Sequence, residues 1–134
     1  MKKNLQILGI IALFLVSFNA QSQQLYNASG SKMGKIDTKN VYDYKGSTIG
    51  KIDNNTAYDA SGNTLGRMDG NTVYDALGST LGRFDGKTIY DASGNSIGKL
   101  EGKEVYNSAG YKLLSFDEVS NEKVILYYFF LFKQ

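Results

Sequence analysis

A repeat of 16 residues runs through most of this chain and restricts its fold more than any other feature. The stretch VYDALGSTLGRFDGKT follows AYDASGNTLGRMDGNT and precedes IYDASGNSIGKLEGKE. Such self-similarity means that one supersecondary unit is copied and that neighbouring copies bury a shared core. The units are residues 25–40, 41–56, 57–72, 73–88, 89–104 and 105–120.

The units share columns of identical or similar residues. Their second position is tyrosine, at Tyr26, Tyr42, Tyr58, Tyr74, Tyr90 and Tyr106. A loop glycine follows, and then a second glycine at Gly34, Gly50, Gly66, Gly82 and Gly98. Next come a cation, an apolar residue and an acid, as in Arg67, Met68 and Asp69. Columns this regular indicate an architecture more than a recurring active site.

Each unit contains two short β-prone runs separated by turn residues. The pair Asp69-Gly70 is typical of a tight type I′ hairpin turn. The longer stretch DASGN also reverses a strand, because Asp, Gly and Asn favour turns. We therefore expect an antiparallel meander with hairpins centred on residues 37–39, 53–55, 69–71, 85–87 and 101–103.

A half-strand is left over at each end of the repeat, around residues 25–27 and 111–116. An open meander of about 12 strands would expose two edges, whereas pairing these half-strands removes both. The sequence therefore predicts an all-β fold, a closed antiparallel ring or shallow barrel of 10–12 strands. A propeller blade would need about 40 residues, and a parallel β-helix would not place a hairpin signal in every unit.

The pairing across the turn predicts which side chains face the lumen of the ring. With Asp69-Gly70 as a two-residue loop, Met68 faces Asn71 and Gly66 faces Val73. Gly66, Met68 and Val73 then share one face, and the other carries Leu65, Arg67 and Tyr74. Unpaired cations inside a barrel are costly, so we expect the first face in the lumen.

The last repeat degenerates, and the chain ends in an apolar, aromatic segment, residues 121–134. About eight strands is the widest ring that its own side chains fill, so a larger ring needs a filler. The run of residues 124–132 is too short to span a bilayer, and a helix that is apolar on all sides is buried or in a membrane. We expect this segment to be a helix threaded through the ring; an extra strand or a membrane-dipping tail are the alternatives. The candidate core or hydrophobic contact residues are Val124, Leu126, Tyr127, Tyr128, Phe129, Phe130 and Phe132.

The unit VYD-x-x-G-x-x-I-G-K-I-D-G-x-T, followed by a hydrophobic C-terminal segment, resembles that of the beta-flower proteins. These are small bacterial proteins of radial β-hairpins around a hydrophobic channel. The resemblance covers residues 25 to about 116 and implies a shallow barrel, similar to Tubby C-terminal and scramblase-like folds, with a hydrophobic helix inside. Five Asp-type hairpins suggest the five-fold form, while six tyrosine columns permit a six-fold one. It implies no catalytic residues. The YDALG and YDASG stretches also resemble YD repeats of Rhs-type proteins, whose units are longer and usually read GR at the turn.

The N-terminus has the layout of a secretory signal peptide. Two lysines precede an apolar run from Leu8 to Phe18, and small residues at Ala20 and Ser22 fit cleavage before Gln23. An uncleaved anchor, the alternative, usually needs about 20 apolar residues. We therefore expect a signal peptide at 1–22 and one domain at 23–134, exported to the periplasm, the outer membrane or the medium.

Composition narrows the chemistry available to this domain. The chain contains no Cys and no His, which removes thiol nucleophiles, imidazole bases and the usual zinc ligands. Lys2 and Lys3 lie in the predicted signal peptide, and without them 13 of the 15 basic residues remain. They equal the 13 acidic residues in number, and basic and acidic side chains alternate along the sequence. Nucleic-acid binding needs a clustered basic face and is not expected.

The repeated polar columns each have a functional and a structural interpretation. The tyrosines could stack on sugars, but cross-strand packing is their commoner use. The aspartates at 43, 59, 75 and 91 could hold calcium, but Asp before such a loop most often bonds its own backbone. The cations could bind lipid head groups, although alternating charge usually marks a solvated surface.

Three functions follow from these alternatives. The first is an exported, non-enzymatic structural or interaction module of the bacterial cell envelope, with no cofactor or metal and an unknown partner. The second is a binder of lipid or another hydrophobic ligand, through the lumen or the aromatic segment. The third is a carbohydrate-binding repeat protein.

Overall fold

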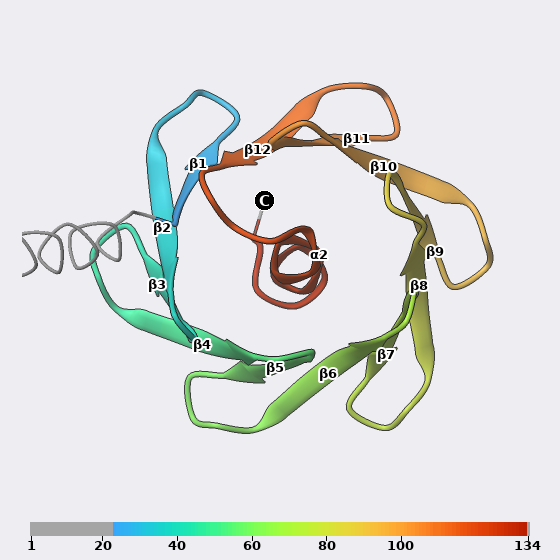
Figure 1. Cartoon of the computed structure of the whole chain (residues 1–134), viewed down its shortest axis with the longest axis horizontal. Coiled ribbons are helices and arrows are strands. Elements are labelled where there is room, and N and C mark those ends of the chain that lie inside the picture. Colours follow the sequence, from blue (N-terminus) through green and yellow to red (C-terminus); the bar gives the residue numbers. More distant parts are fainter. Residues whose placement is uncertain (1–22, 134) are drawn as a thin grey trace, which may run out of the picture.

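The computed structural model describes residues 23–133 and shows a closed ring of antiparallel strands around one helix (Figure 1). Every strand pairs with its neighbours along the chain, and β1 pairs with β12 to close the ring. The predicted closure by the two terminal half-strands is confirmed. The predicted signal peptide, residues 1–22, lies outside the described residues.

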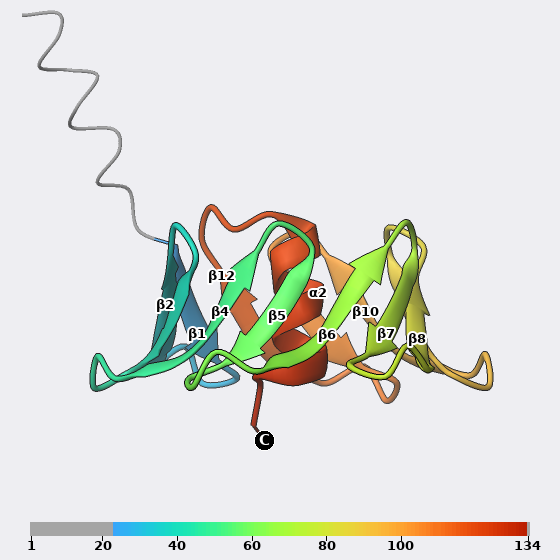
Figure 2. The same ribbon diagram turned by 90° about the horizontal axis from the view of Figure 1, so that it is seen from below.

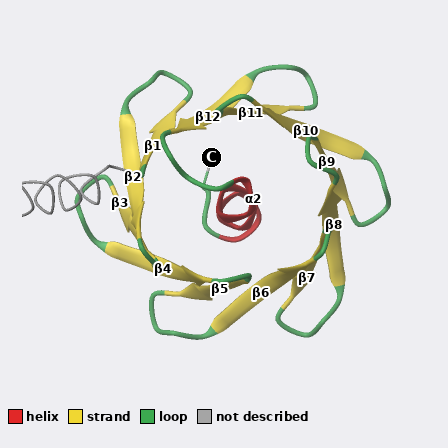
Figure 3. Cartoon of the chain, in the orientation of Figure 1, coloured by secondary structure: helices red, strands yellow, loops and turns green. Residues whose placement is uncertain are grey.

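Long and short strands alternate around the ring (Figure 3). The strands are β1 (Gln24–Asn27), β2 (Lys32–Asp37), β3 (Asn40–Asp43), β4 (Thr48–Asp53), β5 (Thr56–Asp59), β6 (Thr64–Asp69), β7 (Thr72–Asp75), β8 (Thr80–Phe84), β9 (Thr88–Asp91), β10 (Ser96–Glu101), β11 (Glu104–Asn107) and β12 (Lys112–Phe116). The helix is α2 (Asn121–Phe130).

The two ends of the ring differ in their connections (Figure 2). One, which we call the turn end, carries the tight turns at residues 38–39, 54–55, 70–71, 85–87 and 102–103. The other, which we call the loop end, carries the four-residue loops at residues 28–31, 44–47, 60–63, 76–79, 92–95 and 108–111. The helix starts at the turn end and finishes at the loop end, where the C-terminus lies (Figure 2).

The register of the tight hairpins differs from the prediction by one residue. Asp69 pairs with Thr72 and Met68 with Val73, so the two-residue loop is Gly70-Asn71. The φ of Gly70 is +63°, and Asn71 is not among the described residues with positive φ. The type I′ prediction is therefore wrong, since that turn needs positive φ at both loop residues; the observed φ pattern is that of type II′.

The predicted lumenal face is confirmed for Gly66, Met68 and Val73, which are buried, while Arg67 is exposed. Leu65 departs from the prediction, because it packs against the core instead of lying outside. The register between β5 and β6 shifts at this point: Ala57 pairs with Gly66, but the next residue, Tyr58, pairs with Thr64, so Leu65 is skipped. This bulge leaves Leu65 without a cross-strand partner and breaks the simple alternation of faces.

Two rings of fully or nearly buried side chains line the lumen. The short strands β1, β3, β5, β7, β9 and β11 contribute Leu25, Val41, Ala57, Val73, Ile89 and Val105. The long strands β2, β4, β6, β8, β10 and β12 contribute Ile36, Ile52, Met68, Phe84, Leu100 and Phe116. Both rings come from fixed columns of the repeat, so a single short sequence produces the whole lumenal wall.

Candidate functional site: the plugged lumen and the two ends of the ring

The C-terminal segment forms the predicted helix inside the ring. Ser120 caps it, its Oγ accepting a hydrogen bond from the backbone N–H of Lys123 at 3.3 Å. The helix ends at Leu131, whose N–H donates to the carbonyl of Tyr127 at 2.8 Å. Among residues 23–133, no helix combines the length and apolar character needed to cross a membrane.

The middle of the helix is buried against the lumenal wall. Val124, Ile125 and Leu126 have no exposed surface, and Tyr127 is 4% exposed. Burial raises the pKa of Tyr127 to about 12, and it also raises the pKa of Tyr128. Tyr128, Phe129, Phe130 and Phe132 are partly buried and pack against the same core. The ring thus brings all the predicted aromatic residues together, as a core plug that reaches the loop end.

The second glycine of the first five units lies at a close backbone approach across the sheet. A Cβ on Gly50 would lie 2.6 Å from the carbonyl oxygen of Tyr58, and one on Gly98 would lie 2.5 Å from that of Tyr106. The main role of these glycines is therefore to let neighbouring strands approach each other, and making room for side chains in the lumen is a second role.

Three of these glycines also make room for the plug. A Cβ on Gly50 would lie 2.8 Å from Leu131 Cδ2, and one on Gly82 would lie 2.8 Å from Phe129 Cζ. Gly66 faces Phe130 in the same way. Gly34 and Gly98 meet only backbone atoms. The expectation that lumenal glycines admit the aromatic segment holds for one side of the ring.

The helix stands off-centre because the sixth unit lacks this glycine. Leu114 stands where the other units have the glycine; it is fully buried and belongs to β12, which lies between β11 and β1. The helix lies nearer β5 and β6 than β11 and β12 (Figure 1), and its backbone approaches β4, β5 and β6. A bulky residue on one side of the lumen and glycines on the other set this position.

The loop end contains a hollow of about 640 Å³. The apolar residues around it are Met33, Ile49, Leu65, Tyr127, Phe130 and Leu131. Asp43, Tyr44, Asp59 and Lys133 stand around it as well. Pockets of this size and character commonly take small apolar ligands.

On the outer surface, each repeat cation lies over the tyrosine of the neighbouring strand. The guanidinium carbon of Arg67 lies 4.5 Å from the ring centroid of Tyr74, and that of Arg83 lies 4.0 Å from the ring centroid of Tyr90. The lysine pairs are Lys35 with Tyr42 at 5.5 Å, Lys51 with Tyr58 at 4.8 Å and Lys99 with Tyr106 at 5.5 Å. A cation over a ring occupies the face that a sugar would stack on.

The seam between the first and last strands lacks this pair. Tyr26 faces Ser115, where the other units have a cation. Its hydroxyl donates instead to the carboxylate of Asp117 at 2.7 Å, and this hydrogen bond raises the pKa of Tyr26. In the neighbouring unit the hydroxyl of Tyr106 donates to Glu104, which raises the pKa of Tyr106.

The acid after each tyrosine braces its own loop, which is the structural interpretation of that column. Oδ1 of Asp91 accepts the backbone N–H groups of Ser93 and Asn95, both at 2.9 Å. Asp43, Asp59 and Asp75 do the same, and Asn27 and Asn107 replace them in the outer units. Hydrogen bonds from these loops lower the pKa of Asp59 and Asp91. Within residues 23–133, no group of three acids is placed to hold a metal ion.

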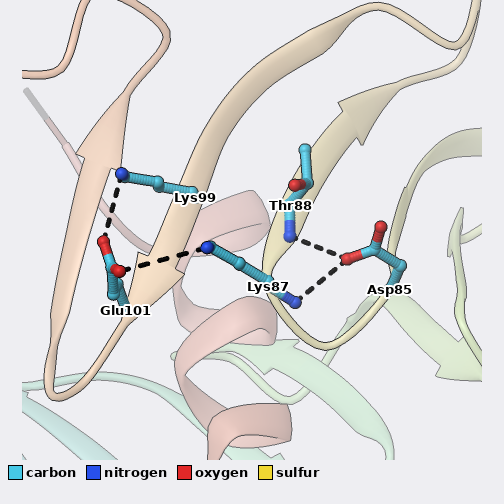
Figure 4. Close-up of polar contacts among 5 residues, drawn as sticks. All are labelled: Asp85, Lys87, Thr88, Lys99 and Glu101. Carbon is cyan, nitrogen blue, oxygen red and sulfur yellow. Dashed lines mark hydrogen bonds and ion pairs between the residues drawn. The ribbon is translucent and has the colours of Figure 1, made fainter.

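Ion pairs join neighbouring turns at the turn end (Figure 4). Asp85 accepts the N–H groups of Lys87 and Thr88 at 3.0 and 2.8 Å, and these bonds, that of Thr88 above all, lower its pKa. Lys87 Nζ reaches Glu101 of the next hairpin at 4.0 Å, and Lys99 reaches the same carboxylate at 3.1 Å. The pKa of Glu101 is lowered, chiefly by the hydrogen bond from Lys99. This end is a rim of charges.

Sequence reasoning missed several residues that shape the loop end. Leu131 is buried against Gly50, although the uniform apolar run gave no reason to single it out. Tyr44, Leu77 and Tyr111 are 70%, 93% and 72% exposed. A signal for these three was present, because each breaks a column that is small or polar in the other units.

The comparison with known families agrees with this geometry. The family model described as the 5-fold beta-flower protein matches residues 22–132. No curated protein and no solved structure matches the chain. The ring of hairpins, the helix inside it and the extent of the match together show that the chain belongs to the 5-fold beta-flower proteins.

Proposed function

We propose that the protein is a non-enzymatic interaction module of the bacterial cell envelope, exported by its N-terminal signal peptide, and that the loop end is its contact surface. The observation that carries this proposal is the set of six braced loops at one end of a closed ring. In each of them an Asp or Asn side chain accepts two loop N–H groups.

The backbone of these loops is the same, while their outward residues differ. The first loop residue is Ala in most units and Tyr44 in one; the second is Ser in several and Leu77 in one. A fixed frame that presents varied side chains suits recognition, since little conformational entropy is lost on contact. The repeated cations, tyrosines and aspartates are engaged in contacts that hold the ring, which supports a structural rather than a catalytic role.

Site-specific photo-cross-linking in cells tests this proposal. A benzoylphenylalanine replaces Leu77 at the loop end or, as the matched control, Asn71 at the turn end of the full chain. We expect envelope-fraction adducts from position 77 and few from position 71. Equal yields from both positions, or a protein that stays in the cytoplasmic fraction, would contradict it.

A second candidate function is the binding of one hydrophobic molecule in the loop-end hollow. Its apolar wall, which includes Leu65 and Phe130, favours this function. Mass spectrometry of an organic extract of the purified protein should reveal a stoichiometric ligand, which Leu65→Trp displaces. Leu65→Ile is the control, because isoleucine occupies the same column at Ile49 and Ile97. An empty extract from the unaltered protein contradicts it.

A further inference from the structure

One buried tyrosine of the plug has a hydroxyl that the fold does not use. Tyr127 is only 4% exposed. The hydroxyls of Tyr26, Tyr90 and Tyr106 donate to acids of the ring. Within residues 23–133 the hydroxyl of Tyr127 has no such partner, and burial alone raises its pKa to about 12. The group therefore stays protonated and is free to donate a hydrogen bond.

The Tyr127 oxygen faces the loop-end hollow. In the described part of the chain, every fully buried side-chain nitrogen or oxygen has a hydrogen-bond partner. The Tyr127 oxygen has none, so it is not sealed in the core and keeps some accessible surface. The residue lines the loop-end hollow, and we place that surface there. Because a buried tyrosine hydroxyl usually finds a partner, the partner is expected to come from a molecule in the hollow.

Most of the wall around this hydroxyl is apolar and comes from one column of the repeat. Met33, Ile49 and Leu65 are the residues that the register shifts of β2, β4 and β6 skip. The helix adds Phe130 and Leu131. An apolar hollow of about 640 Å³ with an unpaired hydroxyl in its wall has the layout of a small-molecule site, in which a few polar groups fix the orientation of the ligand.

The charged groups beside the hollow restrict the polar group of such a ligand. Oδ1 of Asp43 and of Asp59 accepts N–H groups of its own loop, and these bonds, that of Asn63 above all, lower the pKa of Asp59. The cation beside them, Lys133, is exposed. An anionic group would lie near two carboxylates, which is repulsive, and a cationic group would compete with the loops for them. An uncharged group avoids both costs.

We propose that the loop-end hollow binds an uncharged, lipid-like molecule whose carbonyl or hydroxyl oxygen accepts a hydrogen bond from Tyr127. The proposal rests on the second function proposed above, the binding of a hydrophobic molecule, and names the ligand class and the residue that orients it. The apolar body of the ligand lies against Met33, Ile49 and Leu65. A ligand without the oxygen leaves the hydroxyl unpaired and binds more weakly.

Retention of two volatile probes by the mature protein tests this proposal. Octan-2-one and octane have chains of the same length and differ in the carbonyl group, and headspace gas chromatography measures the free fraction of each. We expect Tyr127→Phe to weaken the retention of octan-2-one roughly two- to tenfold, the effect of one hydrogen bond, and to leave that of octane unchanged. Leu65→Trp should abolish the retention of both probes, and Leu65→Ile should preserve it.

Tyr26→Phe is the matched control, because it also removes one tyrosine hydroxyl. That hydroxyl donates to Asp117 at the seam of the ring, away from the hollow. We expect Tyr26→Phe to lower the thermal midpoint and to leave the retention of octan-2-one unchanged. Tyr127→Phe breaks no hydrogen bond of the described fold, so its thermal midpoint should not fall.

The outcomes separate the hydrogen bond from the hollow. Equal effects of Tyr127→Phe on both probes overturn the role of the hydroxyl and leave the binding of an apolar molecule standing. Retention of neither probe by the unaltered protein rejects the hollow as a site, and the second proposed function with it, while the cross-linking test of the interaction module is unaffected. If octanoate or octylammonium displaces octan-2-one at a lower concentration than octan-2-ol does, the uncharged ligand class is wrong.

Discussion

The guanidinium of Arg83 lies 4.0 Å from the ring centroid of Tyr90, its direct partner across β8 and β9. The hydroxyl of the same tyrosine donates to Asp85 at 3.0 Å. A cation and an acid of one unit and the aromatic ring of the next thus form a continuous strip on the outer wall. Because the columns repeat, this pairing of cation and ring recurs around the ring and joins neighbouring strands without covalent links.

A double-mutant cycle on Arg83→Met and Tyr90→Leu should give a coupling of about 0.5–1 kcal/mol in the free energy of unfolding, the size of an exposed cation–π contact. Urea denaturation of the four proteins measures it. The control cycle, Ser115→Ala with Tyr26→Leu, tests the seam, where the facing residue carries no charge, and should give a coupling near zero. Equal couplings in both cycles would mean that general packing, and not the cation, is responsible.

Gly66→Ala should destabilise the ring more than Gly98→Ala does, by about 1–3 kcal/mol in the free energy of unfolding. A Cβ at either position meets a tyrosine carbonyl, but only the one at Gly66 also meets the ring of Phe130. The double variant Gly66→Ala, Phe130→Leu should recover much of this difference. Equal losses at the two glycines, measured by denaturant titration, would show that the plug does not press on this wall.

The repeat made the ring and its filler predictable. Fixed columns identify the turns, the two unpaired half-strands require closure, and a wide ring requires a plug. The outward placement of Arg67 followed from the cost of a buried cation. These inferences need only the type of residue found at each position of the repeat, which can be read from the sequence.

The finer geometry could not be read in the same way. Asp69-Gly70 and Gly70-Asn71 are both acceptable two-residue turns, so turn chemistry alone does not set the register. The bulge that turns Leu65 inward breaks the two-residue alternation on which face assignments rest. The off-centre position of the helix depends on Leu114 on one side of the lumen and on glycines on the other side. The sequence does not show that these residues lie across the lumen from each other.

Acid should weaken the fold through the braced loops, and Asp59→Asn with Asp91→Asn should reduce that effect. Loop hydrogen bonds lower the folded-state pKa of both groups below the ordinary 3.8. Their contribution to stability is therefore present above 3.8 and is lost as the pH falls through the lowered folded pKa. Asn27 and Asn107 brace equivalent loops without a charge, so the asparagine variants should fold. Urea midpoints across the acid range measure the slope, and an unchanged slope in the variant would contradict the linkage.

Ile125→Ala should lower the free energy of unfolding by about 2–5 kcal/mol, because it leaves a cavity between the helix and the wall. Ile125 has no exposed surface, whereas Glu122, one turn earlier, is exposed. Glu122→Ala is therefore the matched control and should change stability little. A chain that ends at Ser120 should lose cooperative unfolding, since the lumenal rings of Val73 and Met68 would then face water. If that chain unfolds cooperatively with an unchanged midpoint, the helix is not part of the core.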